Sequence, residues 1–199
     1  MDILPQLIAS GLAAGSLYAL MALGFVLIFK TTDVVNFAHG DMAMLSAFTA
    51  HMALTSWGWP YAASLALAVA VGFGLGALAD LLLRPARMRG APILTLLIAT
   101  LGISFMFNAL GGRFFGYQSV RMPYAIAGAP LDLAGLIVTR HNLLIFIVAG
   151  VLALSLFMLL KYTRLGTAMR AMAQNSQAAQ LMGVSVRNVS MLSWGIGAS

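Results

Sequence analysis

A succession of long apolar runs, separated by short polar and basic stretches, is the feature that most limits how this chain can fold. Each run is about as long as the roughly 20-residue helix that crosses a bilayer. Backbone buried in lipid has to satisfy its own hydrogen bonds, and a helix does so within one segment. The sequence therefore predicts an all-α, polytopic transmembrane helical bundle of about five full spans and the start of a sixth near Met191. The full spans are expected at residues 4–29, 34–54, 61–83, 93–110 and 142–160.

Composition excludes an ordinary water-soluble domain. The chain is 61% hydrophobic and 8% charged, whereas a soluble domain carries about 25% charged residues. The formal net charge is +6, but most Lys and Arg residues lie between apolar runs, as topology determinants do. They form no basic stripe that would indicate nucleic acid as a partner. The chain contains no Cys, so it offers neither a disulfide framework nor a thiolate metal site.

The basic loops predict the orientation in the membrane. Arg84, Arg87 and Arg89 follow the third span, and the segment after the fifth span is also basic. Two crossings separate these regions, so they lie on one side, which the positive-inside rule makes cytoplasmic. The N-terminus and the long connection 111–141 are then outside. Within that connection, residues 130–138 alternate loosely and predict a small β-hairpin.

Small residues at helical spacing predict close contacts between helices. Gly11 and Gly15 share a face of the first span, and Gly72 and Gly76 share a face of the third. Glycine at this spacing lets a neighbouring helix approach closely. The alternative is that glycine is simply common in membrane helices.

A polar cluster opens the second span. Asn36, His39, Gly40 and Asp41 lie close together where lipid disfavours ionisable groups. In one interpretation this is a cytoplasmic turn between two helices, with Asn36 or Asp33 capping the second. In the other, a broken helix exposes polar groups to the route of a polar solute, so that the cluster lines a translocation pathway. His39 alone indicates a hydrogen-bonded structural histidine rather than a metal ligand.

The polar segment 161–190 contrasts with the apolar spans. Residues 163–175 predict one helix, and residues 177–182 continue it or form a second helix that ends at Gly183. The small, Met-rich apolar residues favour docking in a cleft of a protein partner over lying on lipid. An ordinary cytoplasmic loop is the alternative. The apolar surface is expected to include Ala168, Ala171, Met172, Ala178, Ala179, Leu181 and Met182.

Several blocks of residues resemble a known family. Residues 15–25 read GSLYALMALGF, and residues 35–41 read VNFAHGD. With their spacing, they resemble the N-terminal signature of the H-type subunit of the high-affinity branched-chain amino acid ABC permeases. Residues 163–171 resemble the cytoplasmic loop that couples such permeases to their ATPases. Importer coupling loops often carry Glu where this chain has Gln177. The coupling residues that the resemblance implies are Gly166, Arg170, Asn175, Gln177, Ala178, Ala179 and Gly183.

The resemblance implies a multi-pass subunit of an ATP-driven importer in the bacterial inner membrane. It implies translocation of leucine, isoleucine, valine or a related small solute. The implied partners are a second permease subunit, two ATP-binding subunits, a periplasmic or extracellular substrate-binding protein and membrane lipid. The chain itself contains no G-x-x-x-x-G-K-[ST] motif, which favours ATP hydrolysis in a partner. We expect no enzymatic role, catalytic residue, metal or cofactor in this chain.

The resemblance also bears on the domain organisation. Family members continue through further spans, so the chain is interpreted as a permease that is truncated at its C-terminus. Residues 1–199 are expected to form a single transmembrane permease domain. The segment 161–190 is expected to be the cytoplasmic coupling segment within it.

A self-sufficient channel or secondary transporter for a small polar solute is the alternative function. Its marks are paired carboxylates within the membrane or repeated broken helices. Asp41 and Asp80 are the closest candidates for such carboxylates. A membrane enzyme is disfavoured, because the sequence offers neither a nucleophile with a base nor a metal-binding pattern.

Overall fold

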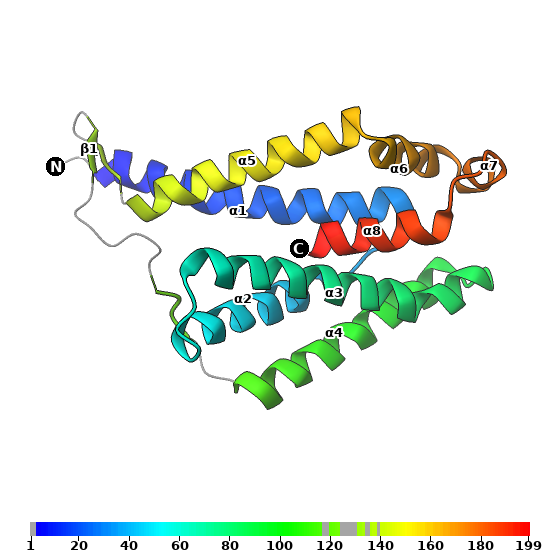
Figure 1. Ribbon diagram of the computed structural model, residues 1–199, viewed down its shortest axis with the longest axis horizontal. Helices are drawn as coiled ribbons and strands as arrows, with labels where there is room; N and C mark the ends of the chain where they lie inside the picture. The colour runs from blue at the N-terminus through cyan, green and yellow to red at the C-terminus, as the bar shows by residue number, and fades with distance from the viewer. Residues whose placement is uncertain (1–2, 117–119, 124–130, 134–135, 139) are drawn as a thin grey trace.

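The chain folds into a bundle of helices with one small hairpin (Figure 1). The computed structural model describes residues 3–116, 120–123, 131–133, 136–138 and 140–199. This architecture confirms the predicted all-α, polytopic bundle. In chain order the described helices are α1 (Ile3–Thr32), α2 (His39–Thr55), α3 (Tyr61–Met88), α4 (Ile93–Phe115), α5 (Arg140–Tyr162), α6 (Arg164–Gln174), α7 (Ser176–Leu181) and α8 (Val186–Ala198).

Four of the described helices, α1, α3, α4 and α5, are long and apolar enough to cross a membrane. The second apolar run forms a shorter helix than the sequence predicts. Helix α2 has only 17 residues and begins at His39. At 1.5 Å per residue it is about 25 Å long, less than the ~30 Å hydrocarbon layer. The described residues therefore hold four full-length spans and one shorter helix where the sequence predicts five full spans.

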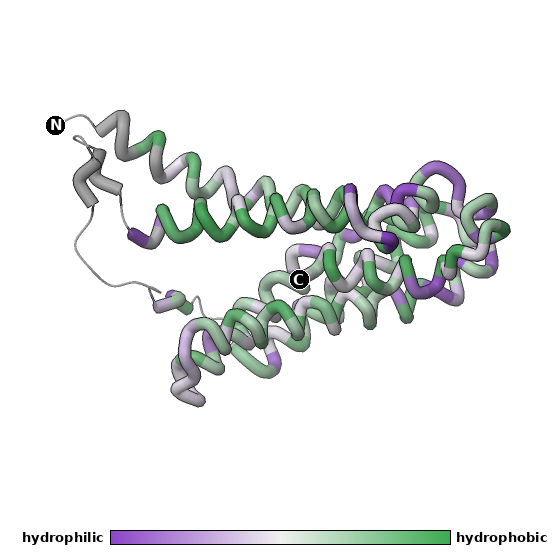
Figure 2. The backbone as a smooth tube through the Cα atoms, turned by 45° about the horizontal axis from the view of Figure 1, so that its top comes forward, coloured by the Kyte–Doolittle hydropathy of each residue, from purple (hydrophilic) through white to green (hydrophobic). Residues whose placement is uncertain are grey.

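Large apolar side chains cover the outside of the long helices. Tyr18 on α1, Phe105 on α4 and Phe157 on α5 are all exposed. Figure 2 shows hydrophobic residues along the length of the bundle and hydrophilic residues gathered at the end formed by α6 and α7. A soluble protein rarely exposes so much contiguous apolar surface. The chain is a multi-pass membrane protein whose helices are covered by lipid or by other subunits.

The predicted hairpin is confirmed in the described residues. Strand β1 (Leu131–Leu133) pairs antiparallel with β2 (Leu136–Val138), and Leu131 lies opposite Val138. The hairpin lies beside the N-terminal end of α1 (Figure 1). Pro130, with which the predicted hairpin starts, and residues 134–135 lie outside the described residues.

The third span is longer than the sequence predicts. Helix α3 continues through Pro85 and ends at Met88, so the expected basic loop is largely helical. A proline inside a helix removes one backbone hydrogen bond. Here Arg84 and Arg87 both form ion pairs with Asp80 on the preceding turns of the same helix. The pair with Arg87 links the turns on either side of Pro85.

Helix α8 begins at Val186 rather than near Met191. Hydropathy places the start of the run late because Arg187 and Asn188 occupy the first turn. Packing begins earlier, since Val189 and Ser190 are already buried. The predicted polar segment 161–190 therefore overlaps the first turn of a core helix.

Glycines set the position of α8, which lies between α1 and α3 (Figure 1). A Cβ added at Gly24 of α1 would come within 2.3 Å of the Gly197 carbonyl oxygen. A Cβ at Gly76 of α3 would come within 2.1 Å of the Trp194 carbonyl oxygen. Gly72, one turn earlier, would meet the carbonyl oxygen of Ala198 at 2.8 Å. Backbone therefore packs directly on backbone along both sides of α8, which is possible only without side chains at these positions.

The other predicted packing pair lies on an open face of the described chain. Apart from the adjacent residues and the nearby backbone of α1 itself, no described atom lies within 4 Å of a Cβ added at Gly11 or Gly15. Both residues are exposed on the N-terminal half of α1. A helix contact at this face stays a prediction.

Candidate functional site

The polar cluster is a break between two helices. Helix α1 ends at Thr32, and Asp33 adopts a positive φ of 54°, which turns the chain sharply. The following residues are not helical, yet Val34 and Ala38 are buried and Asn36 is only 2% exposed. Non-helical backbone at membrane depth is tolerated only where protein or a water-filled cavity surrounds it. Here protein encloses Val34, Asn36 and Ala38, whereas Asp33 and Phe37 are exposed.

Two side chains satisfy the backbone of this break. The Asn36 Oδ1 accepts a hydrogen bond from the Ala38 backbone N–H at 3.1 Å. The buried Thr100 hydroxyl of α4 shares its one proton between the Val35 carbonyl oxygen at 3.1 Å and the Leu97 carbonyl oxygen of its own helix at 2.8 Å. An unsatisfied buried backbone group costs about 1–3 kcal/mol. Asn36 and Thr100 therefore hold the chain in its interrupted form.

Asp41, in the first turn of α2, is linked to α4 by two hydrogen bonds. The Ser104 hydroxyl donates to one carboxylate oxygen, and the Asn108 amide donates to the other at 3.2 Å. Asp41 and Ser104 are half-buried, whereas Asn108 is exposed. The cluster therefore opens on a face of α2 and α4 that the described chain leaves uncovered.

His39 and Gly40 lie beside this carboxylate in sequence but face different surroundings. The His39 imidazole contacts Phe25 of α1 edge to face, with ring centroids 6.4 Å apart. Its Nδ1 is buried without a hydrogen-bond partner among the described residues. Gly40 is exposed and has open space around it. Of the four predicted pathway residues, Gly40 and Asp41 are thus next to open surface, while Asn36 is enclosed and His39 packs on α1.

The predicted coupling segment forms two short helices. Thr163 caps α6 by accepting a hydrogen bond from the Gly166 backbone N–H at 3.0 Å. Asn175 separates the helices and caps α7 by accepting from the Ala178 backbone N–H at 2.9 Å. Helix α7 ends at Leu181, and Gly183 has a φ of +86°, a conformation that favours glycine after a helix end. Of the two predicted alternatives, a continued helix or a second helix that ends at Gly183, the structure has the second helix.

Gly166 makes the corner between α5 and α6 possible. A Cβ at this position would lie 2.3 Å from the Leu159 carbonyl oxygen and 2.4 Å from that of Leu160. These are backbone atoms at the end of α5, so they cannot rotate away. Any side chain at Gly166 has to push α6 away from α5.

The apolar surface of this segment is smaller than the sequence predicts. Met172 and Ala179 are buried, because they pack with Leu27 of α1 and Val189 of α8. Sequence periodicity could not show that the core of the bundle reaches this far. Leu181 and Met182 do remain open, with exposed fractions of 88% and 86%. Arg170, Asn175, Gln177, Ala178 and Gly183 are also exposed.

A buried charge network joins the coupling segment to the bundle. Asp80 of α3 is completely buried and pairs with Arg84 and Arg87. The Ser190 hydroxyl at the start of α8 donates to Asp80 and accepts from the Arg87 guanidinium at 2.9 Å. Ser190 therefore ties the start of α8 to the last turns of α3. Asp80 therefore has two cationic partners and is not a free intramembrane carboxylate.

Sequence reasoning missed three polar residues of α4. Thr100, Ser104 and Asn108 are spaced four apart, so they lie along one face of the helix. A polar stripe in an otherwise apolar span is a signal that could have identified the face toward α2. The partners Asp41 and Val35 lie over sixty positions earlier in the chain, and nothing in the sequence indicates that pairing.

The bundle of long apolar helices, the non-helical connection between α1 and α2, and the exposed helices α6 and α7 are those of a polytopic membrane protein. The family of branched-chain amino acid transport system permease components matches residues 7–199. The chain belongs to this family.

Curated relatives match along most of the chain. The permease protein BraD of a high-affinity branched-chain amino acid transport system from Pseudomonas aeruginosa is 27% identical over 210 residues, with 98% of this chain and 67% of the relative covered. The corresponding protein LivH of Salmonella typhimurium is 28% identical, with the same coverage. A probable LivH of Methanocaldococcus jannaschii is 30% identical and covers 90% of this chain and 58% of the relative. No solved structure matches the chain.

Proposed function

We propose that this chain is a permease subunit of an ATP-binding-cassette importer for branched-chain amino acids or related small solutes. Residues 1–199 belong to one transmembrane permease domain in the bacterial inner membrane. The chain hydrolyses no ATP itself. It works with a second permease subunit, two ATP-binding subunits and an external substrate-binding protein. The observation that carries the proposal is the exposed tip of α7, which presents apolar side chains at the hydrophilic end of a bundle that belongs to a permease family.

The translocation pathway runs along the uncovered face of α2 and α4. Gly40 provides open backbone, and Asp41 with Ser104 and Asn108 provides a fixed set of polar groups. Polar residues at membrane depth face a cavity or a partner, because lipid would leave them unsatisfied. Asn36 and His39 belong to the same site as residues that position the break.

The pathway is tested by uptake of radiolabelled leucine into proteoliposomes that contain the assembled importer. Asp41→Asn and Ser104→Ala should each lower the uptake rate several-fold, because they remove the charge or the hydroxyl of the polar set that we place on the solute route. Ser155→Ala is the matched control, since Ser155 is exposed on α5 and bonds only within its own helix. Equal uptake by Ser104→Ala and Ser155→Ala would remove this face from the pathway.

The segment 161–190 couples the bundle to the ATP-binding subunits. Its contact surface is the exposed set of Arg170, Asn175, Gln177, Ala178 and Gly183 with the tip residues Leu181 and Met182. Ala179 and Gly166 support this surface without being part of it. Ala179 anchors α7 in the core, and Gly166 fixes the corner between α5 and α6. Gln177 is uncharged, so among the exposed residues of this surface the charged contact falls to Arg170, beside apolar burial at the tip.

Coupling is tested by measuring ATP hydrolysis and leucine uptake in the same proteoliposomes. Leu181→Ala, Met182→Ala and a bulky replacement of Gly166 should leave the complex able to hydrolyse ATP while uptake per ATP falls. Thr95→Ala is the control, since Thr95 is exposed at the start of α4, outside the segment 161–190. Unchanged uptake per ATP in all three variants would contradict the proposal. Leucine uptake by the permease without its ATP-binding subunits would instead support a secondary transporter.

A further inference from the structure

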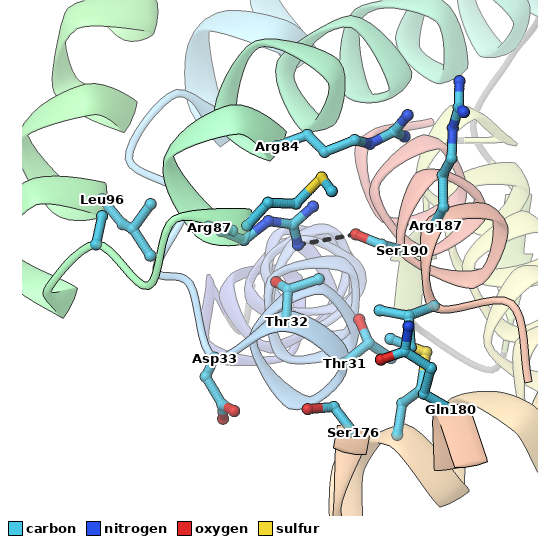
Figure 3. A pocket seen from close by; sticks show the side chains of 14 residues that line it. Thr31, Thr32, Asp33, Arg84, Arg87, Leu96, Ser176, Gln180, Arg187 and Ser190 are labelled. Carbon is cyan, nitrogen blue, oxygen red and sulfur yellow. Dashed lines mark hydrogen bonds between the residues drawn. The ribbon is translucent and has the colours of Figure 1, made fainter. Parts of the chain in front are cut away.

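A cavity of about 620 Å³ lies where α1, α3, α7 and α8 meet. Its walls come from segments far apart in the sequence, including the end of α1, the last turns of α3 and the start of α8. Figure 3 shows Arg84, Arg87 and Arg187 on one side of the cavity and Asp33 and Ser176 on the other. The translocation pathway proposed above uses none of the residues that line this cavity.

The cavity carries more positive than negative charge. Arg84 and Arg87 share the single carboxylate of Asp80, so one guanidinium there is not neutralised. Arg187 also lines the cavity and forms no hydrogen bond or ion pair with any described residue. Asp33 on the opposite wall is exposed to solvent, which screens its charge. The three guanidinium groups exceed Asp80 and Asp33 by one charge, and the excess lies on the arginine side.

We expect the cavity at the depth of the lipid headgroups, from the length of α3 and the predicted topology. Helix α3 has 28 residues and is about 42 Å long, so it extends beyond the ~30 Å hydrocarbon layer. Arg84 and Arg87 are in its last turns, at the end that the basic residues assign to the cytoplasmic side, so we expect them at the level of the headgroups. The neighbouring wall is apolar, with Met88 of α3 and Leu96 of α4. An entrance that combines apolar side chains and guanidinium groups fits a phospholipid, whose phosphate and acyl chains meet at this level.

We propose that this cavity binds the phosphate of an anionic membrane phospholipid. Arg187 and Arg84 contact the phosphate oxygens, because their guanidinium groups hold N–H donors that no described residue uses. The Ser190 hydroxyl joins this cationic wall, and Ser190 also binds Asp80. The bound lipid therefore sits on the network that connects α8 to α3. The inference depends only on the membrane location and not on the transported solute.

The test measures retention of phosphatidylglycerol by the purified importer complex in native mass spectrometry, after reconstitution in mixed phosphatidylglycerol and phosphatidylcholine nanodiscs. Arg187→Gln should lower retention about fivefold, the effect of one arginine near an anionic lipid surface. Arg89→Gln is the matched control, because Arg89 is exposed nearby but does not line the cavity. Asp33→Asn should raise retention, since it removes a negative charge.

Several results would overturn the assignment. Equal losses for Arg187→Gln and Arg89→Gln would mean that general surface charge attracts the lipid. No loss for Arg187→Gln would mean that the cavity is not the site. If Arg187→Gln lowers the retention of phosphatidylcholine as strongly as that of phosphatidylglycerol, the cavity does not select anionic lipid. A further arm adds inorganic phosphate to complexes in phosphatidylcholine nanodiscs and measures their melting temperature. If phosphate raises the melting temperature of the wild-type complex and not that of the Arg187→Gln complex, the ligand is a soluble phosphate instead. Leucine uptake measured on the same variants keeps this outcome separate from the function of the permease.

Discussion

Replacing Gly76 by Ala should destabilise the bundle by disturbing the contact between α3 and α8. The added Cβ would lie 2.1 Å from the Trp194 carbonyl oxygen, whereas real Cβ atoms essentially never approach closer than 3.0 Å. The oxygen is part of the α8 backbone, so it cannot rotate away. Helix α8 would have to move by about 0.9 Å, and overpacking of this kind costs about 1–3 kcal/mol.

Gly74→Ala provides a control on the same helix. A Cβ there meets nothing within 4 Å, so the substitution brings only the gain in helix propensity, about 1 kcal/mol. That gain is the same in both variants, and the difference between them therefore equals the packing cost at Gly76. For a domain of this size each kcal/mol corresponds to about 2–4 °C in melting temperature.

The assay is a thermal melt of the purified permease, followed by loss of the monodisperse peak in size-exclusion chromatography. Gly74→Ala should melt at or above the wild-type temperature, and Gly76→Ala several degrees below Gly74→Ala. Identical melting temperatures for the two alanine variants would refute the direct backbone contact between α3 and α8.

Three further substitutions test other parts of the structure by the same melt. Asp80→Asn leaves two partly buried guanidinium groups without their anion, and should destabilise by about 3 kcal/mol; an unchanged melt would mean that the network contributes nothing. Thr100→Val removes the donor to the Val35 carbonyl and should cost about 1–3 kcal/mol, while Thr95→Val on the exposed start of α4 should not. Gly183→Ala places a Cβ at a φ of +86° and should cost about 1–2 kcal/mol, and equal stability would contradict the left-handed stop after α7.

The bundle itself could be predicted from hydropathy, because each span is a local property of the sequence. The starts of α3 at Tyr61 and of α4 at Ile93 follow from Pro60 and Pro92, which suit the first residues of a helix. The hairpin could be predicted from its alternation. The interruption at Asn36 was visible as a polar cluster, but its two interpretations could not be separated without its partners.

The rest could not be predicted because it depends on contacts between distant residues. Ser190 meets Asp80 across 110 positions, and Gly197 meets Gly24 across most of the chain. Hydropathy placed the start of α8 too late, since it cannot detect a buried turn that also contains Arg187. The apolar face of α6 and α7 was overestimated for the same reason: a buried Met172 and an exposed one have the same sequence pattern.

The exposed α7 tip supplies the most direct test of the account, because it has to face the cytosol to meet an ATP-binding subunit. The described chain contains no Cys, so Met182→Cys introduces a single thiol, and Ser56→Cys in the exposed α2–α3 connection provides a marker for the opposite side. In vesicles that hold the permease without its ATP-binding subunits, a membrane-impermeant maleimide should label Met182→Cys only when the vesicles are inverted and Ser56→Cys only when they are right-side-out. Labelling of Met182→Cys from the outside of right-side-out vesicles would contradict the orientation and, with it, the coupling role of α7.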